Sequence, residues 1–165
     1  MAGALGAFDS FRADRARYPR NAWLSERSLW AIAVYRFGQF ARARGSRAGV
    51  ALHRALILVS QILTGIEISS RASIGPGLRI HHAGPVVIGH ARLGAECTLR
   101  VGNIIGTTKS GEWPVLGDRV ALGAGAQVLG GVTIGENVTV GALSLVVKDV
   151  PANTVVVGIP ASALV

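Results

Sequence analysis

Two adjacent histidines, His81 and His82, are the residues of this sequence best suited to chemistry near neutral pH. An imidazole changes its charge in that range without a large shift of its pKa, so either ring can serve as a general base. Both lie in the segment 81–85 (HHAGP), where a regular spacing of aliphatic residues is interrupted. Function is commonly placed where a regular scaffold is irregular, and this segment is therefore the first candidate site.

The regular spacing is a six-residue repeat, which is clearest between Leu116 and Pro151. Aliphatic residues return at every sixth position, namely Leu116, Leu122, Val128, Ile134, Val140 and Val146. Small or branched residues follow four places later, at Val120, Ala126, Val132, Val138, Ser144 and Val150. A period of six fits neither a strand nor a helix, and it indicates a parallel β-helix in which three repeats make one triangular coil.

The repeat is interrupted twice on the N-terminal side of this stretch. From Ile80 the next corner is placed at Val87, seven residues on, so one extra residue lies within 81–85. The corner after Ile105 is Leu116, eleven residues away. This gap predicts that residues 106–115 leave the coil as a loop, and their glycine and polar content supports it.

Residues 66–165 are therefore expected to form the β-helix, and residues 1–65 an α-helical segment that caps it. One helix is expected over 9–17 and another over 50–63, the latter covering the open end of the β-helix. Between them, Ser25 is expected to cap a helix with an apolar stripe at Leu29, Ile32, Ala33, Phe37 and Phe40.

The composition suits a single domain with a narrow aliphatic core, because half of the 165 residues are apolar and only 5% are aromatic. The formal net charge of +8 is concentrated in residues 1–60, which hold ten arginines against Asp9, Asp14 and Glu26. No nucleic-acid-binding motif accompanies these arginines, so we interpret them as a solvated helix face and expect no nucleic-acid partner.

The chain has one cysteine, Cys97, which excludes an intrachain disulfide and is expected to be buried filler. No membrane span is expected, since the most apolar run, 48–63, is interrupted by His53, Arg54 and Gln61. The first residues lack the basic region of a secretory signal. We therefore expect a cytoplasmic protein.

Several segments together resemble the serine acetyltransferase branch of the hexapeptide-repeat acyltransferases. They are the repeats, residues 74–82 (IGPGLRIHH) and the closing residues 158–161 (GIPA). Upstream, Ala13-Asp14 and residues 34–38 (VYRFG) are similar to the helical segments of that family. The resemblance implies a left-handed parallel β-helix and the transfer of an acetyl group from acetyl-CoA to a hydroxyl, with a histidine as general base.

The resemblance also implies roles for particular residues. His82 matches the family histidine by its distance from the Ile-Gly-x-Gly segment, and the one-residue shortening after it leaves His81 as an alternative base. Asp14 matches an acidic residue near the substrate; the alternative is a surface helix charge paired with Arg17 or Arg12.

The family binds the pantetheine arm of CoA along a groove between subunits, against main chain beside small residues. On this basis the donor site is expected at Gly106, Thr107, Gly123, Ala124, Gly141 and Ala142. Lys109 and Lys148 are expected either to meet the CoA phosphates or to be solvated lysines.

The acceptor is left open between serine and a sugar hydroxyl. The family's serine enzymes carry an Arg-His pair before a proline, whereas Glu112 and Trp113 precede Pro114 here. A carboxylate there repels the carboxylate of an amino acid, and the paired histidines resemble short relatives that acetylate sugars during exopolysaccharide assembly. Trp113 is expected either to stack on a sugar ring or to pin the loop.

We expect the protein to lack most of the family's long N-terminal extension and its cysteine synthase docking tail, which favours a homotrimer over a dimer of trimers. No metal is expected, because His81, His82 and His90 lack the spacing of the β-helical carbonic anhydrases, whose three histidines bind a metal. A non-catalytic scaffold is the third reading, suggested by the missing Arg-His pair.

Overall fold

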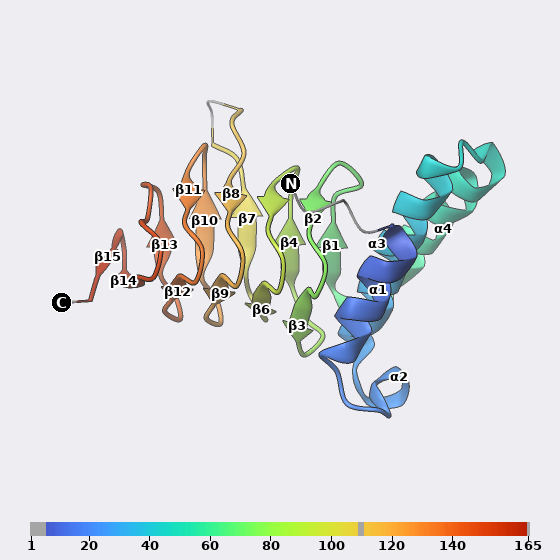
Figure 1. Cartoon of the computed structure of the whole chain (residues 1–165), viewed down its shortest axis with the longest axis horizontal. Helices are drawn as coiled ribbons and strands as arrows, with labels where there is room; N and C mark the ends of the chain where they lie inside the picture. The colour runs from blue at the N-terminus through green and yellow to red at the C-terminus, as the bar shows by residue number, and fades with distance from the viewer. Residues whose placement is uncertain (1–5, 109–110, 165) are drawn as a thin grey trace.

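The computed structural model describes residues 6–108 and 111–164, which form a helical segment at one end of a triangular β-helix (Figure 1). The helices are α1 (Ala7–Ala16), α2 (Ala22–Ser25), α3 (Arg27–Ala43) and α4 (Arg47–Thr64). The β-helix follows directly, because β1 (Ile66–Ile68) begins two residues after α4 ends.

Three sheets form the faces of the prism, and the chain passes through them in the same order in each coil, except that the last coil has no strand in the second sheet. The first sheet contains β1, β4 (Val86–Ile88), β7 (Ile104–Gly106), β10 (Gln127–Leu129) and β13 (Leu145–Val146). The second contains β2 (Ser73–Ile74), β5 (Arg92–Leu93), β8 (Val115–Leu116) and β11 (Thr133–Ile134). The third contains β3 (Arg79–His81), β6 (Thr98–Arg100), β9 (Ala121–Leu122), β12 (Thr139–Val140), β14 (Val155–Gly158) and β15 (Ala161–Ala163). Neighbouring strands pair in parallel apart from β14 and β15, so the predicted parallel β-helix is confirmed.

The three edges of the prism are the turns between sheets, and each carries a different kind of residue. The histidine edge follows the third sheet and comprises residues 82–85, 101–103, 123–126 and 141–144. The loop edge follows the first sheet and comprises residues 69–72, 89–91, 130–132 and 147–149 with the segment between β7 and β8. The glycine edge follows the second sheet and comprises residues 75–78, 94–97, 117–120 and 135–138.

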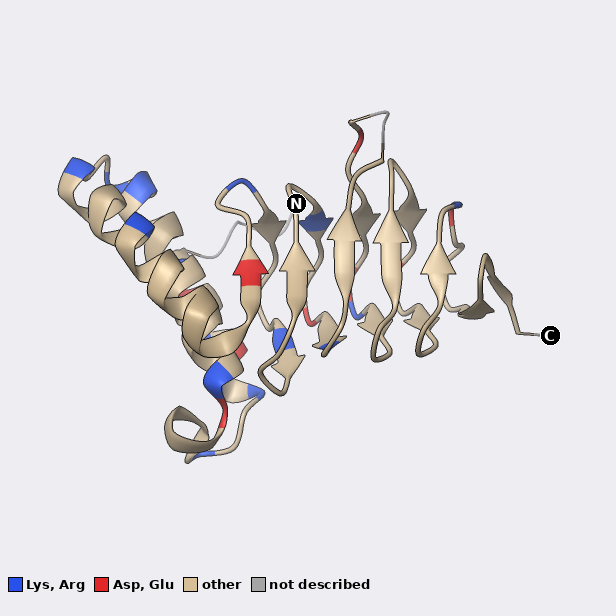
Figure 2. Ribbon diagram, turned by 180° about the vertical axis from the view of Figure 1, so that it is seen from behind, with Lys and Arg blue, Asp and Glu red and all other residues tan. Residues whose placement is uncertain are grey.

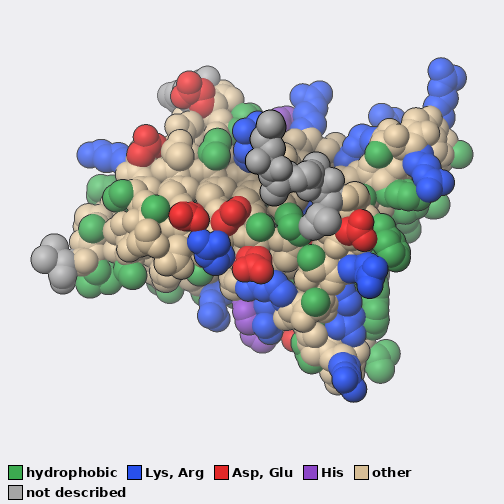
Figure 3. Space-filling view, in the orientation of Figure 1, with side chains coloured by type: hydrophobic (Ala, Val, Ile, Leu, Met, Phe, Trp, Pro, Cys, Tyr) green, Lys and Arg blue, Asp and Glu red, His purple; other side chains and the backbone are tan. Residues whose placement is uncertain are grey.

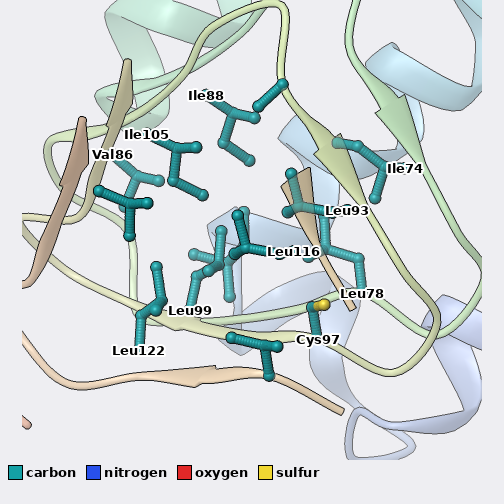
Figure 4. Packing of buried hydrophobic residues seen from close by; sticks show 14 of the residues in the cluster. Ile74, Leu78, Val86, Ile88, Leu93, Cys97, Leu99, Ile105, Leu116 and Leu122 are labelled. Atoms are coloured by element: carbon teal, nitrogen blue, oxygen red, sulfur yellow. The ribbon is translucent and has the colours of Figure 1, made fainter. Parts of the chain in front are cut away.

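The core is a column of aliphatic side chains that point inward from all three sheets (Figure 4). Residues of successive coils stack on one another, as Ile74, Leu93 and Leu116 do along the second sheet. All three are at most 6% exposed, and Cys97 lies in the same column, as expected of buried filler.

The predicted corner at Val87 is wrong. Val86 and Ile88 are fully buried, while Val87 lies between them and faces outward, level with Glu67 and Ile104. The inward repeat thus passes from Ile80 to Ile88, and the turn after β4 is shortened before Leu93. The net insertion is still one residue, but it is divided between two edges of the prism.

The helical predictions need three corrections. Ser25 ends α2, and α3 begins after Glu26 without a side-chain cap, so the predicted Ser25 cap is wrong. The predicted stripe is wrong in part, because Phe40 is exposed and the buried side of α3 carries Tyr35 and Arg36 instead. Finally, α4 packs along α3, and the end of the β-helix is covered by both helices, with α3 reaching β1 and β3.

The glycine edge sets how closely the coils stack. Gly75, Gly94, Gly117 and Gly135 lie one above another there, each against the backbone of the next coil. A Cβ on Gly117 would lie 2.7 Å from Glu136 N and 2.9 Å from the carbonyl carbon of Gly135. No side chain fits at that distance, so the glycines are required by the coil spacing.

Gly117→Ala is therefore expected to lower the free energy of unfolding by about 1–3 kcal/mol, the usual cost of overpacking. The control is Gly106→Ala, whose Cβ would approach nothing closer than Leu129 Cδ2 at 3.4 Å. Urea unfolding of both variants measures the difference. Equal midpoints for the two would contradict the role given to the glycine edge.

Candidate active site

His82 is the first residue after β3, at the start of the histidine edge, and its side chain is exposed. Its backbone is left-handed, with φ of 65°, an uncommon conformation for a residue with a Cβ. Other turns of the prism place Glu96, Arg119, Asn137, Leu143 and Asn153 in the same conformation. The conformation at His82 thus follows from the corner geometry, which carries the imidazole clear of the sheet.

Two helical side chains hold the strand that presents His82. Tyr18 Oη donates to Ile80 O at 3.1 Å and accepts from Ile80 N at 2.9 Å. Ser28 Oγ donates to the same carbonyl at 2.8 Å. Since Ile80 lies two residues before His82, the helical segment fixes the position of the candidate base.

His81 is half-buried on the outer face of the third sheet, with its ring centroid 6.3 Å from that of His82. Burial lowers the pKa of His81, and the positive charges of Arg79 and Arg100 lower it further. The ring of His81 is therefore held neutral to lower pH than an ordinary histidine, and His81 stays the alternative base.

Asp14 is completely buried, and its carboxylate joins three parts of the fold. Oδ2 accepts from Arg36 Nε at 2.8 Å, and Oδ1 accepts from Arg36 Nη2 at 3.1 Å. Oδ1 also accepts the backbone N–H of Leu78 at 2.7 Å. The interpretation of Asp14 as a surface charge paired with Arg17 or Arg12 is therefore wrong, and contact with an acceptor stays a prediction.

Asp14→Asn leaves the charge of Arg36 buried without its partner, and we expect it to cost about 3–5 kcal/mol of unfolding free energy. The matched control is Glu136→Gln, which removes the exposed ion pair to Arg119. That change is expected to cost about 1 kcal/mol or less. Thermal and urea unfolding measure both, and a similar loss in the two variants would contradict the structural role of Asp14.

The loop edge carries the second cluster of predicted residues. The half-buried Trp113 stacks on His90 with ring centroids 4.6 Å apart, and a Cβ on Gly89 would overlap the indole. These contacts are those expected of a side chain that pins the loop, while stacking on a sugar stays a prediction. Glu112 lies against Gly131. A Cβ added to Gly131 would lie only 2.7 Å from the Cβ of Glu112.

The predicted donor residues are divided between the same two edges. Gly123, Ala124, Gly141 and Ala142 lie on the histidine edge, in the coils that follow His82. Gly106, Thr107 and Lys148 lie on or next to the loop edge, and Lys109 falls outside the described residues. In Figures 1 and 2 the turn after β3 is at the bottom of the prism and the segment between β7 and β8 at the top. One protomer therefore does not bring the two groups together.

Two other titratable residues, Cys97 and His53, are buried within the fold. Burial raises the pKa of the Cys97 thiol to about 11, which leaves it a poor nucleophile near neutral pH. His53 is buried between α3 and α4, where Gly38 allows its ring to approach, and burial lowers its pKa. The described residues contain no cluster of three or more His, Cys, Asp or Glu side chains placed to hold a metal ion.

Sequence reasoning missed Ser28 and Arg36, which together with Tyr18 are the polar side chains that dock the helices on the first coil. The signal available was weak: Arg36 lies in the VYRFG segment and Tyr18 directly precedes a proline. Their partners are between 22 and 62 residues away, so only the packed structure identifies them.

By length and hydropathy, the described helices fall short of what crossing a bilayer requires.

The sequence is similar to a family of hexapeptide transferases and to serine acetyltransferases. The family described as bacterial transferase hexapeptide (six repeats) matches residues 114–148. Serine acetyltransferase of Helicobacter pylori is 38% identical over 152 residues, which cover 88% of this chain and 87% of the relative. Serine acetyltransferase of Synechococcus elongatus is 47% identical over 111 residues, which cover 65% of this chain but only 46% of that longer relative.

A solved structure extends the similarity to the whole fold. The crystal structure of Neisseria gonorrhoeae serine acetyltransferase in complex with serine superposes with a TM-score of 0.83 and 30% sequence identity. The match covers 96% of this chain and 69% of that one. The chain therefore belongs to the serine acetyltransferase branch of the hexapeptide-repeat acyltransferases.

Proposed function

We propose that this protein is an acetyl-CoA-dependent O-acetyltransferase whose acceptor is a small hydroxyl compound, with L-serine the first acceptor to test. The observation that carries the proposal is the identity to the Helicobacter pylori serine acetyltransferase over nearly the full length of both chains. The crystal structure of the Neisseria gonorrhoeae relative holds serine, which supports the choice of acceptor.

In the proposed reaction, the imidazole of His82 takes the proton of the acceptor hydroxyl as its oxygen attacks the thioester carbonyl of acetyl-CoA. The C–S bond then breaks, and the CoA thiolate takes the proton back from the imidazolium. The acetyl group ends on the acceptor oxygen, and the histidine returns to its neutral state. His81 remains the alternative base.

The donor is proposed to lie along the histidine edge. Gly123, Ala124, Gly141 and Ala142 follow His82 along that edge, one coil after another. Small residues let the amides of a pantetheine arm approach the main chain closely. Such an arm would point the thioester towards His82 and carry the CoA phosphates towards the later coils.

A homotrimer completes this site. The histidine edge and the loop edge border the first sheet on its two sides, so three prisms with that sheet inward place each histidine edge beside a neighbour's loop edge. The neighbour then contributes Trp113 and Lys148. Exposed apolar side chains on α4, such as Leu58 and Ile62, are typical of a surface that another subunit covers.

A sugar hydroxyl is the second candidate acceptor. The observation in its favour is Glu112-Trp113 on the loop edge, because an exposed carboxylate suits hydroxyl groups better than it suits an amino acid's carboxylate. The indole also offers an apolar face, although one side of it is already occupied by His90.

The proposed base is tested by His82→Asn, since asparagine tolerates the left-handed backbone at this turn. We expect turnover to fall by a factor of about 100 or more, the usual contribution of a general base. Release of free CoA thiol with L-serine and with neutral sugars measures it, and His81→Asn tests the alternative base. Full activity in His82→Asn would exclude His82 as the base.

The shared site is tested by mixing two inactive variants, His82→Asn and a Trp113→Ala variant that also lacks residues 107–111. In mixed trimers, about a quarter of the clefts combine an intact His82 with an intact neighbouring loop, so we expect activity to reappear after unfolding and refolding the mixture. Separately refolded variants are the control. A mixture that assembles into trimers and stays inactive would show that each site belongs to one protomer.

A further inference from the structure

Three basic side chains gather on the outer face of the third sheet, next to His82. Arg79 and His81 are two residues apart on β3 and therefore share a face of the strand. Arg100 lies on β6, directly level with His81 in the parallel register. Figure 3 shows histidine and basic side chains side by side at this lower edge of the prism.

These arginines are not neutralised by the acids around them. The ion pairs among the described residues are Asp14–Arg36 and Arg119–Glu136, and neither includes Arg79 or Arg100. The guanidinium of Arg79 lies over the ring of Tyr18, 5.6 Å from its centroid, and its buried Nε lacks a hydrogen-bond partner. This contact holds Arg79 in place without satisfying its charge.

Other charges near the cluster are already engaged or weak. Arg17 donates to Gly77 O at 2.6 Å and to Thr98 Oγ1 at 3.0 Å, so it serves the fold. The negative charge of Glu26 raises the pKa of His81, but this effect is smaller than the lowering by either arginine. The charge of Arg79 and Arg100 is therefore available to a ligand.

We propose that Arg79 and Arg100 form an anion subsite beside His82, which binds the carboxylate or phosphate of a hydroxyl-bearing acceptor. This inference rests on the proposed function, and it assigns the acceptor of that reaction to the class of anionic compounds. Guanidinium groups pair with carboxylate and phosphate through parallel hydrogen bonds, which suits this purpose. The carboxylate of L-serine and the phosphate of a sugar phosphate both fit the site.

The position of the cluster assigns it to the acceptor and not to the donor. The phosphates of acetyl-CoA are separated from its thioester by the whole pantetheine arm, whereas Arg100 is level with the residue that adjoins His82. On the loop edge, the residue before Trp113 is the carboxylate Glu112. That position therefore supplies no positive charge to an anionic acceptor, whereas Arg79 and Arg100 lie next to His82 on the third sheet.

The test compares acceptors with and without an anionic group, using the whole chain. L-serine is paired with L-serinamide, and glucose 1-phosphate with methyl glucoside, which separates a carboxylate from a phosphate source. For the anionic member of the pair that reacts, Arg100→Gln and Arg79→Gln are expected to raise KM about tenfold or more, the usual cost of losing a charge-assisted hydrogen bond. The KM of the member without the anionic group and the KM for acetyl-CoA are expected to change by less than about twofold.

The matched control is Arg92→Gln, which removes an exposed arginine from β5 on the second sheet and changes the net charge equally. It is expected to leave every KM unchanged. Arg100→Lys keeps the charge without the planar fork, and we expect it to recover part of the loss. Thermal unfolding of each variant confirms that the fold is intact.

Binding measured without turnover separates this inference from the proposed reaction. L-serine or glucose 1-phosphate is expected to raise the unfolding temperature of the wild type more than the analogue without the anionic group does, and Arg100→Gln is expected to abolish the difference. A protein that shows this difference but acetylates no acceptor would refute the proposed reaction alone. Equal effects of the compounds with and without the anionic group, or a raised KM for acetyl-CoA in the variants, would overturn the anion subsite.

Discussion

The first coil of the β-helix has no preceding coil with which to share hydrogen bonds, and the rest of the molecule depends on how that deficit is met. Helical side chains take the place of the missing backbone: Tyr35 donates to Ala72 O, Arg36 to Ile74 O and Gly75 O, and Ser28 to Ile80 O. Buried polar groups left without partners would each cost about 1–3 kcal/mol. The helices therefore act as a substitute coil made of side chains.

This docking also explains where the candidate chemistry lies. His82 follows the coil that the helices hold most firmly, and the same coil carries Arg79 on a neighbouring position of β3. The exposed imidazole thus stands on a backbone fixed from both sides, by the helices and by β6. The loop edge, by contrast, is organised by the stacking of Trp113 on His90. Assembly of such prisms, as proposed, would join a rigid histidine edge to a neighbour's loop.

Much of the fold was predictable because a six-residue period has few structural solutions. The exact course of the first irregular coil was not, since Val87 and Ile88 are both aliphatic and only packing decides which faces inward. Ser25 is a good capping residue in sequence, but the chain turns there to dock α3. The role of Asp14 depended on Arg36, a partner 22 residues away, and no local pattern reports such a pair. The His82 turn was predictable from the interruption of the repeat. The proximity of Arg79 and Arg100 to His82 was not, because it depends on the register between β3 and β6.

The glycine edge has a consequence for how such a protein can change in length. Each later coil meets its neighbours through main chain and closely spaced glycines, so one coil is a nearly interchangeable unit. The coil beneath the helices is different, because particular helical side chains, such as Tyr18 and Asp14, make its contacts. Duplication or loss of a rung far from the helices would lengthen or shorten the prism without moving the imidazole. Evolution and protein engineering are thus free to vary the distal rungs while the helix-bound rung stays constrained.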